Sequence, residues 1–214
     1  MKQLFTVVML SLALSGCQSA YYQAAEQVGY HKREIMVDRV VDARDAQVEA
    51  EEQFQSAQEQ LLELINFDGG DLQDAYEGLN DEYEAAESAA DDVGSRIDAI
   101  EHVADALFDE WADELEEYTN TRLKADSQRK LQKTQRRYAD LIKTMRRSEQ
   151  RMAPILAALK DNVLYLKHNL NAQAMAALRV EFGKIDGDID VLIAEMQKSI
   201  ASSNEFIDSL KKDQ

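Results

Sequence analysis

The chain has 214 residues and a formal net charge of −17 at pH 7, with 41 acidic residues against 24 basic ones. Such an acidic balance argues against a general affinity for nucleic acid. One proline, eight glycines and a composition rich in Ala, Glu, Gln, Asp, Leu and Lys predict long helices and no sheet.

The first residues have the pattern of a secretory signal that ends at a cysteine. Lys2 supplies a positive charge, and the run from Leu4 to Leu14 is apolar apart from Thr6 and Ser11. This run is too short to span a bilayer, which needs about 20 residues, and it matches the apolar core of a signal peptide. The sequence Leu14-Ser15-Gly16-Cys17 resembles the lipobox of a bacterial lipoprotein precursor.

The lipobox resemblance implies a division of the chain into three parts. Residues 1–16 would be the removed signal peptide, residues 17–27 a lipidated Cys17 with a short tether, and residues 28–214 a single helical domain. A lone cysteine suits this role, because a thiol that carries lipid, with acyl chains such as palmitate, needs no disulfide partner. Gln18 stands where an aspartate typically retains lipoproteins in the inner membrane, so the resemblance implies the periplasmic face of the outer membrane. The alternatives are an ordinary signal peptide with an incidental cysteine, or a short buried helix.

Four later stretches carry apolar residues in alternating steps of three and four, which is the pattern of a coiled-coil seam. The clearest runs from Leu72 to Trp111 over nearly six heptads, and Asp71 precedes it as a helix cap. The others run from Met36 to Leu64, from Leu131 to Leu170 and from Met175 to Leu210. Because the breaks between them are short, consecutive helices should be antiparallel neighbours. The predicted fold is all-α, an elongated antiparallel four-helix bundle or coiled coil about 60–70 Å long at 1.5 Å per residue.

The third predicted helix contains an irregularity. Ser148, Met152 and Leu156 are separated by two successive four-residue steps, a stutter that locally unwinds a supercoil. Pro154 lies within that stutter, where its missing N–H would kink or break a helix. We therefore expect the third helix to be bent or broken near Pro154.

Charge is distributed unevenly between the second and third predicted helices. Residues 98–117 hold nine acids and no lysine or arginine, whereas residues 122–151 hold eleven bases and three acids. A hairpin folded about Thr119-Asn120 would place the two segments against each other and help to fix their register. Alternatively, the basic segment could bind phosphate groups of lipopolysaccharide or nucleic acid.

The sequence shows no recognisable catalytic or metal motif. His31, His102 and His168 lack the glutamate three residues earlier that a ferritin-like di-iron bundle needs, and neither a His-Glu-x-x-His pair nor a phosphate-binding loop occurs. Residues 186–190 begin like an EF-hand loop, but Val191 stands where that loop needs glycine, so a solvated helix face is favoured. We expect no catalytic residue, no metal and no cofactor, and we expect that the protein is not an enzyme.

Two stretches depart from the seam pattern and are candidate contact sites. Just past the tether, His31, Lys32 and Arg33 would lie near the membrane head groups. Two turns would share the end of the bundle far from the lipid, and the candidate partner-binding residues there are Phe67, Gly69, Gly70, His168, Asn169 and Asn171. An exposed Phe67 would anchor a partner, with the asparagine amides as hydrogen-bonding groups. The alternative is ordinary turn and capping chemistry, with Phe67 covering the end of the core.

Three segments resemble a known family. Val28–Val40, Asn66–Leu72 and Leu166–Ala172 are similar to an uncharacterised family of proteobacterial envelope proteins, a domain of unknown function, and the likeness runs from about Tyr21 to Leu210. It implies an all-helical lipoprotein or secreted protein and supplies no activity, substrate or catalytic residue.

The expected function follows from the anchor and the bundle. We expect a non-enzymatic outer-membrane lipoprotein that acts as a helical scaffold or adaptor for a periplasmic protein, with the membrane reached through the lipid on Cys17 and no nucleic-acid partner. The alternative is an amphiphile-binding carrier or envelope-stress sensor whose bundle opens at Pro154. The oligomeric state stays open.

Overall fold

The computed structural model describes residues 31–66 and 72–212. These residues form four long helices, which are α2 (Lys32–Ile65), α3 (Leu72–Glu117), α4 (Thr121–His168) and α5 (Ala172–Lys212). No strand occurs in the described part of the chain. Each predicted seam therefore corresponds to one helix, and the all-α prediction is confirmed.

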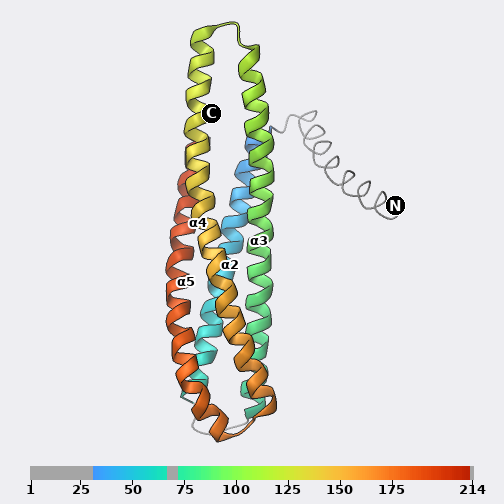
Figure 1. Ribbon diagram of the computed structural model, residues 1–214, viewed down its shortest axis with the longest axis vertical. Helices are drawn as coiled ribbons and strands as arrows, with labels where there is room; N and C mark the ends of the chain where they lie inside the picture. Colours follow the sequence, from blue (N-terminus) through green and yellow to red (C-terminus); the bar gives the residue numbers. More distant parts are fainter. Residues whose placement is uncertain (1–30, 67–71, 213–214) are drawn as a thin grey trace, which may run out of the picture.

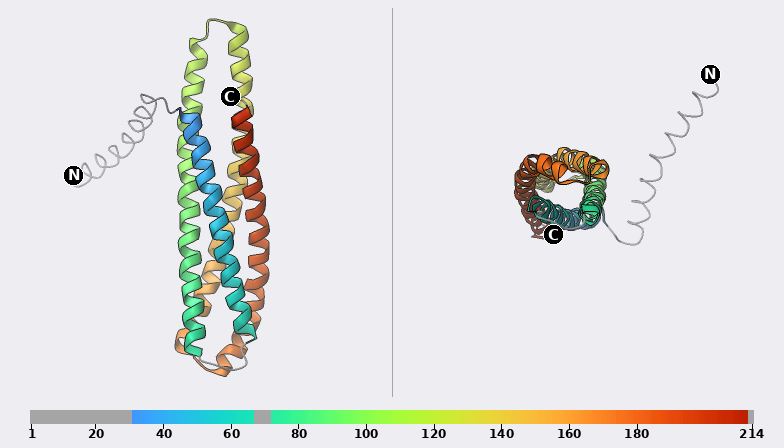
Figure 2. Two further views of the ribbon diagram at one scale, coloured as in Figure 1. Left: turned by 180° about the vertical axis from the view of Figure 1, so that it is seen from behind. Right: turned by 90° about the horizontal axis from the view of Figure 1, so that it is seen from below.

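The helices form a closed ring around one core. Each helix packs against the next in the chain, and α5 completes the ring by packing against α2. The end-on view in Figure 2 shows this ring, and Figure 1 shows that consecutive helices run in opposite directions. With 46 residues at 1.5 Å each, α3 spans about 69 Å. The prediction of an elongated antiparallel bundle is confirmed.

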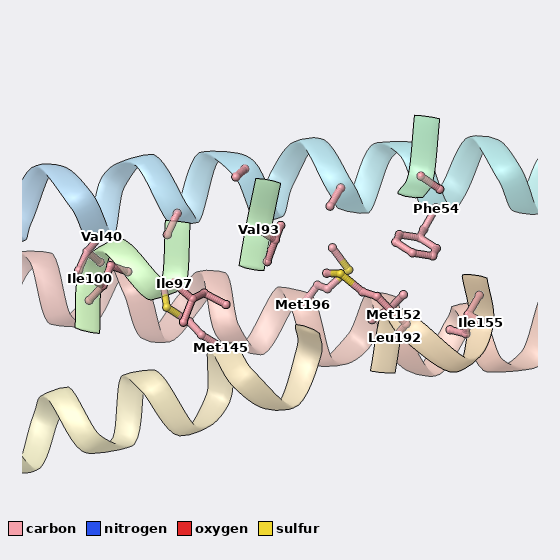
Figure 3. Packing of buried hydrophobic residues seen from close by; sticks show 14 of the residues in the cluster. Val40, Phe54, Val93, Ile97, Ile100, Met145, Met152, Ile155, Leu192 and Met196 are labelled. Atoms are coloured by element: carbon pink, nitrogen blue, oxygen red, sulfur yellow. The ribbon is translucent and has the colours of Figure 1, made fainter. Parts of the chain in front are cut away.

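The core is a column of apolar side chains contributed by all four helices (Figure 3). Phe54, Ile97, Met145 and Phe182 are among the fully buried members, one from each helix in chain order. Between the large side chains lie short ones such as Ala50, whose methyl groups let neighbouring helices approach closely without voids. The seams that the sequence predicted are thus the faces that the bundle buries.

One layer of this core is polar. Gln47 of α2 donates two hydrogen bonds from Nε2, to Ser148 Oγ of α4 and to Ser199 Oγ of α5, both at 3.0 Å, and all three side chains are fully buried. The other amide atom, Gln47 Oε1, is buried without a hydrogen-bond partner. A buried acceptor in that position costs about 1–3 kcal/mol. The layer fixes the axial register of three helices, because sliding one of them would break these bonds.

Pro154 does not end α4. The sequence predicted a bend or a break near Pro154, and the helix is continuous from Thr121 to His168 with Pro154 inside it, so a break does not occur. Figure 1 shows instead that α4 changes direction along its length, its second half slanting across the bundle. Pro154 is exposed, whereas Met152 and Ile155 on either side of it are buried against the other helices. Tertiary packing on the buried face therefore holds the helix together while the missing N–H faces solvent.

The four helices do not end level with one another. Lys32, at the start of α2, pairs with Glu110, and α3 continues for seven residues past that level, about 10 Å. Near the end of α5, Lys212 lines a groove with Lys133, twelve residues after the start of α4. Residues 111–132 of α3 and α4 therefore stand beyond the four-helix body as a projecting hairpin (Figure 2).

Candidate interaction surfaces

The candidate residues at the start of α2 are bound to α3. His31 is exposed and is the N-cap residue of α2. Lys32 Nζ lies 3.0 Å from Glu110 Oε1, and the Arg33 guanidinium lies 5.6 Å from the centre of the Trp111 ring, within range of a cation–π contact. These two bases fasten the first turn of α2 to α3. A contact with membrane head groups stays a prediction.

At the opposite end, the candidate residues of the α4–α5 turn close the end of α4. His168 is the exposed last residue of that helix. Asn169 donates its backbone N–H to Leu166 O at 3.0 Å and its side-chain Nδ2 to Tyr165 O at 2.9 Å, and the Asn171 N–H donates to Asn169 O at 2.9 Å. The Asn169 amide that was expected to serve a partner thus satisfies a carbonyl of its own helix.

The other predicted site residues lie outside the described residues. These are Cys17 and the turn residues Phe67, Gly69 and Gly70. The structure does place the end of α2 and the end of α4 at the same end of the bundle, as the sequence predicted (Figure 1). The roles assigned to these four residues stay predictions.

Exposed large apolar side chains mark the two ends of the bundle, a feature that the sequence analysis did not single out. Leu62, Leu164, Tyr165 and Leu170 lie at the end where α2 and α4 finish, whereas Tyr118 and Leu123 lie at the tip of the projecting hairpin. For five of these six residues the sequence signal was present, because they stand outside the seam positions; Leu170 was predicted to be a seam residue and is instead exposed. Val48, Val180 and Val191 are exposed along the sides.

The tip of the projecting hairpin is a built turn. Asn120 Oδ1 accepts hydrogen bonds from the backbone N–H groups of Arg122 at 3.0 Å and Leu123 at 3.2 Å, so it caps α4. Behind the turn, Lys124 Nζ lies 3.0 Å from Glu116 Oε2 across the two helices. A shallow hollow opens at the tip, lined by Glu114, Glu117, Tyr118, Thr119, Asn120 and Leu123.

Within the four-helix body, Arg146 of α4 binds three carboxylates. It donates to Glu101 from Nε at 3.3 Å and from Nη2 at 2.5 Å, to Asp98 at 2.5 Å, and to Glu149 of its own helix at 3.1 Å. These hydrogen bonds, that to Glu101 foremost, raise the pKa of Arg146 above its usual value. The predicted pairing of the acidic segment of α3 with the basic segment of α4 is confirmed.

Trp111, a predicted seam residue, connects α3 to α4 at the base of the projecting hairpin. Its indole Nε1 donates to Ser127 Oγ at 2.8 Å, and the ring is partly buried against the core. Nearby, Tyr138 packs edge-on against Phe108 with ring centres 5.4 Å apart. Burial, with smaller contributions from Glu101 and Asp105, raises the pKa of Tyr138 to about 12.

The acidic run that begins like an EF-hand loop is part of a helix, as predicted. Residues 186–190 lie within α5, and Gln58 of α2 donates from Nε2 to Asp186 Oδ1 at 2.8 Å and to Asp190 Oδ1 at 2.9 Å. The run therefore serves helix–helix contact. Across residues 31–66 and 72–212, no three His, Cys, Asp or Glu side chains gather closely enough to hold a metal ion.

These features define a class, the long up-and-down four-helix bundles with unequal helix ends. The sequence matches the model of the family described as protein of unknown function (DUF2959) over residues 21–210, and the chain belongs to that family. No functionally curated protein matches the sequence. None of the four described helices is both long and apolar enough to cross a membrane.

Proposed function

We propose that the protein is a non-enzymatic lipoprotein, anchored through Cys17 in the outer membrane and facing the periplasm, whose bundle acts as a scaffold or adaptor for a periplasmic protein. The observation that carries this proposal is the exposure of Leu62, Leu164, Tyr165 and Leu170 at one end of a long rod. Exposed apolar side chains at the same end of a rod favour a contact with another molecule at that end. The lipobox supports the anchor.

The two ends of the rod suit different tasks. The segment that follows Cys17 joins the body at the start of α2, and α2 then runs for 34 residues, about 51 Å, toward the other end. A partner held at that distal end is kept at a set distance from the membrane. The register-fixing layer of Gln47, Ser148 and Ser199 supports a rigid spacer role, because it opposes sliding of the helices.

A pair of matched variants tests the scaffold role in intact cells. Tyr165→Ser removes a 43 % exposed side chain at the distal end, and Val191→Ser removes a 45 % exposed side chain on the side of the bundle. After crosslinking with the anchor retained, we expect the Tyr165 variant to lose its crosslinked partner at unchanged thermal stability and the Val191 variant to keep it. Equal recovery from both variants, or turnover of a defined substrate by the purified protein, would refute the proposal.

A second candidate function is amphiphile binding by an opened bundle. It is favoured by the unpartnered Gln47 Oε1 in a layer whose Ser148 lies six residues before Pro154. Separation of the helices at this layer would let water reach that oxygen and would offset part of the cost of opening. Titration with a fluorescent amphiphile should then change the helix content and the fluorescence of Trp111. Unchanged signals at saturating amphiphile would exclude this alternative.

A further inference from the structure

The tip of the projecting hairpin presents two apolar side chains that no other part of the described chain covers. Tyr118 is 41 % exposed and Leu123 is 54 % exposed. They lie about 10 Å past the level at which α2 begins, so neither α2 nor α5 reaches them. This part of the bundle consists of two helices instead of four.

Two backbone amides at the start of α4 and the Lys124 ammonium are already paired within the hairpin. Asn120 caps the first amides of α4, and Lys124 pairs with Glu116. The turn itself, Tyr118-Thr119-Asn120-Thr121, holds no charged residue. The tip can therefore enter a less polar environment without leaving those turn amides or the Lys124 ammonium unpaired.

The position of the tip points to a membrane. His31 lies at the hairpin end of the bundle, and only 13 residues separate it from Cys17, so the 14 residue-to-residue steps reach at most about 50 Å when fully extended. A lipid on Cys17 thus brings the bilayer to the end of the rod from which the hairpin projects. Tyrosine is enriched at membrane interfaces because its ring is apolar and its hydroxyl is polar.

Charge at the tip selects the kind of lipid surface. The tip carries a net negative charge, since its four acidic residues outnumber its two basic ones, so an anionic surface would repel it. The acids are Asp113, Glu114, Glu116 and Glu117, and the bases are Arg122 and Lys124. Glu114 and Glu117 line the hollow beside Tyr118. Carboxylates next to an aromatic ring are complementary to an ammonium group.

We propose that the tip of the projecting hairpin is a second membrane contact, which rests Tyr118 and Leu123 on a zwitterionic phospholipid surface with amine-bearing head groups, such as phosphatidylethanolamine. This inference rests on the proposed lipid anchor and adds an orientation to it. With the anchor and the tip both on the bilayer, the rod stands upright and its distal end points into the periplasm.

A fluorescent probe at the tip tests this contact in the full lipidated chain. Leu123→Cys supplies one maleimide-reactive thiol, because a lipidated Cys17 cannot react, and the thiol is labelled with an environment-sensitive dye. Leu164→Cys, at a 48 % exposed position near the other end, is the matched control. Both proteins are reconstituted in vesicles of phosphatidylethanolamine and phosphatidylcholine that carry a lipid-linked quencher, and circular dichroism confirms that each variant is folded.

We expect the dye at position 123 to shift to the blue and to be quenched several-fold more than the dye at position 164. The quenching should fall as phosphatidylglycerol replaces the zwitterionic lipid. If Cys17 does not react with maleimide and the dyes at positions 123 and 164 both show the emission of a dye in water, the tip contact is overturned and the anchor stays intact. If the dye at position 123 is already shifted to the blue without vesicles, protein and not lipid covers the tip, and this result would also overturn the tip contact. Reaction of Cys17 with maleimide would overturn the anchor and the tip contact together.

Discussion

Arg146 of α4 binds both carboxylate oxygens of Glu101 on α3, one from Nε and one from Nη2. This forked contact joins the acidic half of the chain to the basic half. Asp98 approaches the same guanidinium from α3 and Glu149 approaches it from α4. Because the Arg146 side chain is only one-quarter exposed, its removal would leave three carboxylates close together without their shared cation.

Arg146→Met should therefore lower the free energy of unfolding by about 1–2 kcal/mol, as expected for loss of a partly buried charged network. The control is Arg129→Met, since Arg129 is largely exposed and pairs with Asp126 of its own helix, an interaction worth less than about 0.5 kcal/mol. Urea denaturation of both variants measures the difference. Equal losses from the two would show that the Arg146 network adds nothing beyond an ordinary surface pair.

For the polar layer of Gln47, Ser148 and Ser199, we expect a substitution that does not lower the stability of the fold. Gln47→Met keeps the side-chain volume and removes the unpartnered Oε1, so thermal stability should stay level or rise. Ser199→Val, in contrast, removes an acceptor from Gln47 Nε2 and should destabilise the bundle. Size-exclusion chromatography of Gln47→Met checks whether the layer also prevents other associations, as polar core residues do in coiled coils. A clear fall in melting temperature for Gln47→Met would mean that the layer is a net stabiliser.

Helical glycines provide a simple test of the packing. A Cβ added at Gly187 meets nothing within 4 Å, so Gly187→Ala should stabilise α5 by up to about 1 kcal/mol through helix propensity alone. At Gly94 the added Cβ would lie 3.2 Å from Glu149 Oε1, beside the Arg146 network. Gly94→Ala should accordingly gain less, or lose stability. Thermal unfolding of both variants ranks them, and a larger gain at Gly94 would contradict the packing of α3 against α4.

The fold could be predicted from the sequence because the seam spacing reports directly which face of each helix is buried. The turn between α3 and α4 could be predicted too, because α3 ends at Glu117 and α4 begins at Thr121, on either side of the expected Thr119-Asn120 turn. The apolar spacing did not show that this hairpin projects beyond the ends of α2 and α5. That hairpin depends on cross-helix polar pairs such as Trp111 with Ser127, which leave no apolar period in the sequence.

The candidate sites were less predictable for a related reason. Lys32 and Arg33 were identified as basic residues beside a tether, but their contacts depend on where α3 lies relative to the start of α2. Likewise, Asn169 has the chemistry of a partner-binding amide, and only its position at the end of α4 turns it back toward Tyr165. The spacing that predicts a helix does not determine which residues of two helices lie at the same level.

The lipid anchor predicts a change of compartment. Cys17→Ala should leave either an unprocessed precursor or a soluble periplasmic form, because several acyl chains at about 0.8 kcal/mol per buried CH₂ are needed for firm anchoring. Cell fractionation and the intact mass of the protein measure this outcome. A correctly cleaved Cys17→Ala variant that still separates with the outer membrane would show that another part of the chain holds it there.

Tyr138 predicts how stability changes at high pH. Burial raises its pKa in the folded protein to about 12, whereas an unfolded tyrosine titrates near 10. Between these two values the unfolded chain loses the proton and the folded chain keeps it, so the contribution is fully present below pH 10 and is lost as the pH rises toward 12. Tyr138→Phe cannot titrate, so its melting temperature should fall less steeply from pH 9.5 to pH 11.5 than that of the unmodified protein. Tyr118→Phe, at an exposed position, is the control and should follow the unmodified protein. If the melting temperature falls equally with pH in all three proteins, Tyr138 titrates as a solvated tyrosine and its packing against Phe108 does not shield the hydroxyl.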